Sequence, residues 1–237
     1  MSRPYNHDIF QRTELLLGES RMTRIAQKHV ILFGVGGVGS WCAETLVRSG
    51  IHHLTIADGD VVVPSNINRQ LMATTATLGQ QKVNVLRERL LQINPDADIR
   101  AIAGRFNADT AESFHLDEYD FVVDAIDSLN DKALLINRVT RLPDTMLVSS
   151  MGAARKFDPT RIRTAEFRKV QGDPLARSLR HKFKQTGVFP ESKFLCVYSD
   201  EILPNACESA DHANGTVAHI TAIFGNMLAS LVLQNIS

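Results

Sequence analysis

The chain has 237 residues, of which 44% are hydrophobic and 22% charged, a composition typical of a globular protein with a substantial core. Its 26 Lys and Arg balance 26 Asp and Glu, which excludes a whole-molecule attraction to nucleic acid or membrane, so such a partner must bind a local patch. Three cysteines without a CxxC pair argue against a disulfide framework and a cysteine-rich zinc site, and they favour a reducing cytoplasm.

The first two-thirds of the chain alternates short strand patterns with longer helical ones, which is typical of an α/β fold with a Rossmann-like parallel sheet. We expect an N-terminal helical arm (1–28), a nucleotide-binding domain (29–150) and a C-terminal extension (151–237) packed on the same domain. Strands are predicted over 29–34, 54–58, 99–103, 121–124 and 146–150. Helices are predicted over 37–50, 79–94 and 130–142.

The C-terminal extension is expected to hold a few antiparallel strands and helices. Two strand-like pieces flank residues 158–160, and a basic helix (173–184), a strand (193–199), a polar loop (204–214) and an apolar helix follow. The segment 215–236 has no charged residue and is about long enough to cross a bilayer, but polar residues interrupt it. We therefore expect a buried helix and no stable membrane association.

The first predicted strand runs into a glycine-rich turn, GVGGVGS at residues 34–40. Such glycines allow the backbone to approach a phosphate, and the following helix N-terminus offers free N–H groups. The candidate phosphate-binding residues are Gly34, Gly36, Gly37 and Gly39. Asp58 ends the next strand, near the spacing at which a carboxylate binds ribose hydroxyls. A tight turn without a ligand is the alternative interpretation.

Three further motifs distinguish ATP from a dinucleotide: SNINRQ (65–70), GQQKV (79–83) and DAIDS (124–128). Arg69 and Lys82 could offset charge on a triphosphate, and Asp127 could hold Mg²⁺. Each residue also has a structural alternative, since Arg69 could cap a turn, Lys82 could be solvated and Asp127 could cap a helix. Their joint occurrence in this order favours an ATP site.

These motifs, together with ADGD at 57–60, resemble the ubiquitin-activating-enzyme-like (ThiF/MoeB-type) adenylating superfamily across roughly residues 5–150. The resemblance implies that the 34–39 turn surrounds the phosphates of ATP, that Asp58 binds ribose, and that Asp127 binds Mg²⁺. It also implies triphosphate contacts from Asn68, Arg69 and Lys82. In this family the segment FQRTEL (10–15) presents an arginine to a partner subunit, so the resemblance implies that Arg12 acts in trans in a homodimer.

Within the superfamily, the rest of the chain is similar to the tRNA threonylcarbamoyladenosine dehydratases. The motifs that carry this resemblance are RTELLLGE (12–19), QGDPL (171–175), CVYSDE (196–201) and the segment 215–225. It implies a ligase-type enzyme that adenylates the carboxylate of threonylcarbamoyladenosine, beside the anticodon of tRNA, and closes it to a cyclic product. The chain departs from sulfur-carrier-activating relatives because it lacks their two CxxC pairs, and its 204–214 loop is short for the dehydratases.

Residues 155–184 contain ten Lys or Arg against three acidic residues. On the predicted helix Arg177, Arg180 and Lys184 share one face, and we expect them to contact tRNA phosphates. A solvated surface helix is the alternative. Phe183, the aromatic residue among these cations, falls on the opposite, apolar face of the predicted helix, and the helix therefore does not predict base stacking.

Three other functions stay open from the sequence. The chain could adenylate the C-terminus of a ubiquitin-like sulfur-carrier protein, act as a scaffold with a sulfur-relay partner, or be a nicotinamide dehydrogenase. Cys196 lies in an apolar strand pattern and is expected to be a small buried residue. Cys207, in a polar loop, is the better candidate for reactivity, although the dehydratase chemistry needs no covalent cysteine intermediate.

Overall fold

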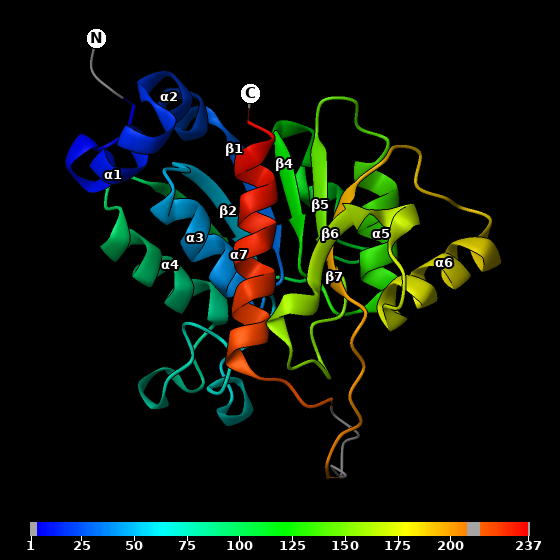
Figure 1. The fold of residues 1–237 in the computed structure, drawn as a ribbon. Helices are drawn as coiled ribbons and strands as arrows, with labels where there is room; N and C mark the ends of the chain where they lie inside the picture. The colour runs from blue at the N-terminus through cyan, green and yellow to red at the C-terminus, as the bar shows by residue number, and fades with distance from the viewer. Residues whose placement is uncertain (1–3, 208–213, 237) are drawn as a thin grey trace.

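The computed structural model describes residues 4–207 and 214–236, and within them the chain forms one seven-stranded sheet in the order β3-β2-β1-β4-β5-β7-β6 (Figure 1). The strands are β1 (His29–Phe33), β2 (His53–Ala57), β3 (Asp98–Ile102), β4 (Phe121–Asp124), β5 (Met146–Ser150), β6 (Ile162–Glu166) and β7 (Leu195–Ser199). Neighbouring strands are parallel except β6 and β7, which are antiparallel. The predicted α/β class with antiparallel pairing near the C-terminal end is confirmed.

Helices cover both faces of the sheet (Figure 1). They are α1 (His7–Leu17), α2 (Glu19–Gln27), α3 (Gly39–Arg48), α4 (Lys82–Ile93), α5 (Leu129–Val139), α6 (Pro174–Thr186) and α7 (Ala218–Gln234). Side chains from α3, α4 and α7 form one apolar cluster with the sheet, and side chains from α5 and α6 form the other. The central strands are Val-, Ile- and Leu-rich because both of their faces are buried.

All five strands predicted in the first 150 residues are present, with bounds within one residue of those expected. The prediction of a strand before Asp158 is wrong, because that segment forms no strand and hydrogen-bonds to two loops. Arg155 has φ +61°, which breaks extended geometry, and its N–H donates to the Gly215 carbonyl at 2.8 Å. Its carbonyl accepts the Leu203 N–H at 2.9 Å. Only the piece after residue 160 becomes a strand, β6.

The apolar C-terminal segment forms the predicted helix, α7, whose burial is confined to one side. Residues 4–207 and 214–236 contain no helix with both the length and the apolarity that a bilayer-spanning helix needs. α7 packs closely across α3 at Gly225, where an added Cβ would lie 2.4 Å from the Val38 carbonyl oxygen and 2.8 Å from the Cys42 nitrogen. Glycine at this position therefore sets the distance between the two helices.

We expect Gly225→Ala to lower the free energy of unfolding by about 1–3 kcal/mol, because the new methyl group overlaps backbone atoms of α3. Urea denaturation followed by circular dichroism measures the change. Gly104→Ala is the matched control, since its added Cβ has no neighbour closer than 3.8 Å. Equal stability of both variants and the wild-type protein would contradict close α3–α7 packing.

Candidate nucleotide-binding site

A cavity of about 710 Å³ opens at the carboxyl ends of the parallel strands, beside the β1–α3 turn. Ligands of open parallel sheets bind at this edge, where the strand order reverses. Here the reversal lies between β1 and β4, whose connections run to opposite sides of the sheet. Of the predicted site residues, the cavity is lined by Gly34, Gly36, Gly37, Asp58, Arg69, Lys82 and Asp127.

The glycine-rich turn allows three backbone segments to approach one another. Gly34 has φ +84°, and a Cβ on it would lie 2.6 Å from the Ala125 carbonyl oxygen in the β4–α5 loop. A Cβ on Gly39 would lie 1.8 Å from the Gly34 carbonyl oxygen. Both positions therefore require glycine, and the turn leaves the N-terminus of α3 beside the cavity.

Asp58 lies at the carboxyl end of β2, as predicted, and its carboxylate also organises the site. One oxygen accepts the Val35 N–H of the glycine turn at 2.8 Å, and the other accepts the Asp60 N–H at 2.8 Å. Each carboxylate oxygen can accept further hydrogen bonds. Asp58 can therefore hold the turn in place and still accept from a ribose hydroxyl.

Lys82 is not a solvated surface residue, since only 7% of its side chain is exposed. Its ammonium lies 2.9 Å from one oxygen of Asp60, and the guanidinium of Arg105 lies 2.6 Å from the other. Burial raises the pKa of Asp60, but the hydrogen bonds from Lys82 and Arg105 outweigh this effect and hold the pKa below its usual value. Both Asp60 and Arg105 line the cavity, and the sequence interpretation missed them as site residues.

Arg69 lies over the glycine turn, where a Cβ on Gly37 would lie 3.2 Å from its Cγ. Its Nη1 donates to the Ser65 carbonyl at 2.8 Å and to Asn68 Oδ1 at 2.9 Å. Asn68 in turn donates to the Thr216 carbonyl at 3.0 Å and does not line the cavity. Asn68 thus positions Arg69, and its expected direct contact with the triphosphate stays a prediction.

Asp127 is held at the cavity by a buried ion pair that the sequence interpretation missed. Lys132 and Asp124 are both fully buried, 2.8 Å apart, and Ser149 donates to the same Asp124 oxygen at 2.6 Å. Lys132 also donates to the Ile126 carbonyl at 3.0 Å, while the Ile126 N–H donates to Asp124 at 3.1 Å. Both backbone groups of the residue before Asp127 are therefore fixed.

The sequence did carry one signal of this ion pair. Lys132 shares a helical spacing with Leu135, Ile136 and Val139, which are all buried, so it occupies a position where an apolar residue is usual. A lysine at such a position needs an anionic partner, because an unpaired buried charge is costly.

Asp127 itself is exposed to the cavity and has no hydrogen-bond or ion-pair partner in the described part of the chain. A free carboxylate in this position suits Mg²⁺, which usually takes one or two protein carboxylates and completes its shell with phosphate oxygens and water. Asp131, one turn into α5, lines the same cavity. The site thus has the donor set for one magnesium ion bound together with a polyphosphate.

Arg12 lies away from this cavity, exposed on α1. Asn6, which caps α1, donates to Asp96 just before β3, and Arg21 of α2 donates to the Leu233 carbonyl near the end of α7. These contacts place α1 and α2 near the amino ends of the strands (Figure 1). Arg12 does not line the cavity of its own chain.

The basic segment is less free than its composition suggests. Lys156 is buried, and Arg180 donates from both terminal nitrogens to the carbonyls of Phe167 (3.2 Å) and Val170 (2.8 Å). Arg177 and Lys184 are exposed on α6. Arg180 therefore has a structural role in holding α6, and its contact with tRNA stays a prediction.

The cysteines differ in exposure as expected. Cys196 is buried in β7, and burial raises the pKa of its thiol well above the usual value, which makes it an inert core residue. Cys207 is exposed, and its reactivity stays a prediction. The rest of the predicted polar loop, residues 208–213, lies outside the described residues.

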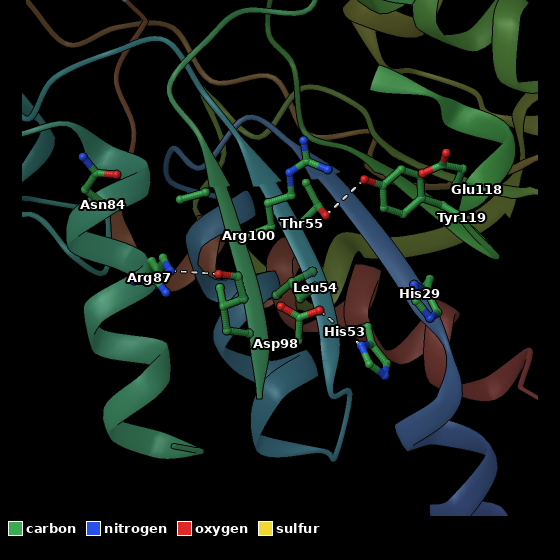
Figure 2. Close-up of a pocket in the computed structure, with 12 residues that line it drawn as sticks. His29, His53, Leu54, Thr55, Asn84, Arg87, Asp98, Arg100, Glu118 and Tyr119 are labelled. Atoms are coloured by element: carbon green, nitrogen blue, oxygen red, sulfur yellow. Dashed lines mark hydrogen bonds and ion pairs between the residues drawn. The ribbon is translucent and has the colours of Figure 1, made fainter. Parts of the chain in front are cut away.

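A second cavity, of about 590 Å³, lies along β1–β3 and reaches the β3 edge of the sheet, where Asn84 and Arg87 of α4 line it (Figure 2). The rings of His29 and His53 stack there at 4.4 Å, and His53 Nδ1 lies 3.5 Å from Asp98. None of the predicted site residues lines it. The described residues also include no group of three or more His, Cys, Asp or Glu that could hold a metal ion. The carboxyl-edge cavity is therefore the candidate site.

Comparisons with known proteins agree with this choice. The model of the ThiF family matches residues 10–237. A tRNA threonylcarbamoyladenosine dehydratase of Escherichia coli is 38% identical over 201 residues, covering 82% of this chain and 74% of the relative. One from Bacillus subtilis is 38% identical over 192 residues, covering 81% and 74%.

Solved structures give the same similarity in three dimensions. The E. coli tRNA N6-threonylcarbamoyladenosine dehydratase TcdA in complex with AMP superposes with a TM-score of 0.89 at 34% identity, covering 97% of this chain and 94% of that one. The same E. coli protein in complex with ATP gives the same TM-score and coverage.

We expect Lys82→Ala to weaken ATP binding roughly 10- to 100-fold, because the variant loses a charge-assisted hydrogen bond in a largely buried position. Isothermal titration calorimetry measures the dissociation constant. Lys28→Ala is the control, since Lys28 also forms a lysine–aspartate ion pair, with Asp120 at 2.6 Å, but is 34% exposed and lies at the amino ends of the strands, away from the cavity. ATP affinity equal to that of the wild-type protein would remove Lys82 from the site.

Proposed function

Because this chain belongs to the ThiF family, and within it to the tRNA threonylcarbamoyladenosine dehydratases, we propose that it uses ATP to dehydrate threonylcarbamoyladenosine in tRNA to its cyclic form. The observation that carries the proposal is the cavity at the glycine-rich turn. There Lys82, Arg69 and Asp127 converge on one space in a fold that superposes closely on a dehydratase bound to ATP.

The reaction balances as an adenylation followed by a cyclisation. A carboxylate oxygen of the substrate forms a bond to the α-phosphorus of ATP, and the bond from that phosphorus to pyrophosphate breaks. An internal nitrogen or oxygen then attacks the activated carbonyl, loses its proton to solvent and displaces AMP. The carboxylate oxygen leaves with AMP, so the nucleoside loses the elements of one water.

The protein's part is to position ATP and stabilise charge on its phosphates. Lys82 and Arg69 are the cations suited to this task. Arg105 remains 2.6 Å from Asp60, so Asp60 keeps one cationic partner when Lys82 turns to a phosphate. When Mg²⁺ is bound, it would neutralise phosphate charge, and Asp127 is the residue suited to hold it.

The tRNA is expected to bind the same end of the molecule, with exposed cations of the C-terminal part, Arg177 and Lys184 among them, contacting its phosphates. Since its substrate is tRNA, we expect the protein in the cytoplasm. A sulfur-relay protein partner has no specific support among the described contacts and stays a prediction.

The decisive test is incubation of the purified protein with ATP, Mg²⁺ and threonylcarbamoylated tRNA, followed by nucleoside mass spectrometry. We expect an ATP-dependent loss of one water from the modified adenosine. If the nucleoside is unchanged while the C-terminus of a sulfur-carrier protein becomes adenylated, the alternative adenylation function replaces the proposal.

A homodimer in which Arg12 completes the partner's site is the second part of the proposal. Arg12, Leu15 and Leu16 lie three and four residues apart on α1 and so share a helix face. The two leucines are 76% and 83% exposed, which is unusual for adjacent large apolar residues in a protein that stays a monomer. A second copy covering this face would bury the two leucines and bring Arg12 toward the cavity of that second copy.

We expect Arg12→Ala and Lys82→Ala to be nearly inactive alone but to complement each other after subunit exchange. In a twofold dimer, half of the dimers from an equal mixture are mixed, and each has one intact site, so activity recovers to about a quarter of wild type. Native mass spectrometry verifies subunit exchange, and product formation is the readout. Verified mixed dimers without activity would show that Arg12 does not act in trans.

A further inference from the structure

Phe157 exposes 62% of its surface, more than any other phenylalanine that the structure describes. Ile202 and Leu203, on the loop that pairs with this segment, are 45% and 40% exposed. Burying such side chains normally stabilises a protein by about 1.5–3 kcal/mol each, so their exposure needs an explanation. A partner molecule that covers the ring provides one.

The backbone of Phe157 is held by side chains on both sides. Its N–H and that of Asp158 donate to one oxygen of the buried Glu201 at 2.8 and 2.9 Å. Its carbonyl oxygen lies 2.9 Å from His219 Nε2, which must donate because a carbonyl only accepts. The imidazole also meets the phenyl ring edge to face, with ring centres 5.2 Å apart. The ring is thus pre-positioned, which lowers the entropy lost on binding.

The residues before Phe157 fix its direction at some energetic cost. Arg155 adopts φ +61°, a conformation that is unfavourable for residues with a Cβ. Lys156 points inward and donates to the carbonyls of Ser199 (2.9 Å) and Glu201 (2.8 Å). The side chain of Lys156 thus points into the protein, and that of Phe157, the next residue, points to solvent. Strained backbone and a buried lysine around one exposed ring suggest that the exposure has a function.

Phe157 does not itself line the nucleotide cavity, but its segment and its contact residue His219 are flanked by residues that do. Ala154, three residues earlier, lines that cavity, and so do Thr216 and Thr221 on either side of His219. The Arg155 N–H donates to the Gly215 carbonyl at 2.8 Å, which ties this segment to the start of α7. α7 begins at the same end of the molecule as the β2–α4 loop (Figure 1).

We infer that Phe157 is a stacking platform for an unpaired base of the tRNA anticodon loop, an inference that rests on the proposed function. The family resemblance implies that the substrate nucleoside stands beside the anticodon, in a single-stranded loop, and proteins bind such bases by stacking them on aromatic rings. Three apolar side chains form far less than the roughly 800 Å² per partner of a stable protein interface, which favours a base over a protein. The sequence pattern of α6 gives no indication of base stacking, and Phe157 lies outside that helix.

Phe157→Ala raises the dissociation constant of an anticodon stem-loop RNA roughly 5- to 100-fold, because one base loses its stacking partner. Phe157→Tyr keeps the affinity near that of the wild-type protein, since it keeps an aromatic face. The salt dependence of binding keeps its slope, because no charge is removed. ATP affinity and melting temperature stay unchanged. Phe189→Ala removes the other exposed phenylalanine, 53% accessible, and leaves RNA affinity unchanged.

Phe157→Trp gives a direct readout of stacking. The sequence has a single tryptophan, Trp41, so the added emission is the difference from the wild-type protein. Stem-loop RNA quenches this added emission, whereas a fully paired duplex of similar charge, which has no unpaired base, does not. A merely structural role of Phe157 would produce no quenching.

The inference is overturned if Phe157→Ala binds the stem-loop within twofold of wild type, if Phe189→Ala loses as much affinity, or if Phe157→Ala changes the oligomeric mass in step with RNA affinity. That last result would make the patch a protein interface. Stem-loop binding that depends on Phe157, without ATP-dependent dehydration, would uphold the platform and overturn the proposed function. If the wild-type protein binds neither the stem-loop nor the duplex, both the stacking platform and the proposed function are overturned.

Discussion

The candidate nucleotide site at the carboxyl ends of the strands depends on how closely the end of β1 approaches its neighbours β2 and β4. Gly34 donates to the Ala57 carbonyl at the end of β2, and Ala125, just after β4, donates to the Phe33 carbonyl at the end of β1. The gap between Gly34 and Ala125 has no room for a side chain. This approach brings the loop with Asp60 and the loop with Asp127 to opposite sides of one turn, where a nucleotide can contact both.

Around that turn, charges are held in pairs that differ in burial. The Lys132–Asp124 pair is fully buried, fixes the β4–α5 loop and has no access to ligand. The Lys82–Asp60 pair opens on the cavity, with Arg105 as a second partner for the carboxylate. The buried pair therefore supports the loop, and the open pair is the one that a ligand in the cavity can reach. Breaking the first would leave a buried uncompensated charge, whereas Asp60 of the second would keep Arg105 as a partner if Lys82 moved away.

The C-terminal part extends the sheet and supplies the rim of the same cavity. β7 continues the parallel order beside β5, β6 closes the edge antiparallel to it, and α7 crosses α3 at Gly225. Several of its many cations are used internally, as Arg180 and Lys156 show. Fewer cations are therefore free to contact a polyanion than the count of basic residues implies. An exposed aromatic ring such as Phe157 would then contribute a larger share of RNA binding.

The sequence by itself determined the strands, their parallel class and most of the residues that the structure brings together at the candidate nucleotide site. Buried strands are continuous apolar runs, and the glycine-rich turn and the positions of Arg69, Lys82 and Asp127 are local motifs. Both can therefore be recognised without knowing which elements lie beside them in the fold. Only the tertiary structure assigned Asn68 to support Arg69, gave Asp60 two cationic partners, and buried Lys132 and Lys156. It also turned the piece before Asp158 away from strand geometry. The physical reason is that a polar side chain's role is set by the partner it meets, and these partners come from distant elements that only folding brings together.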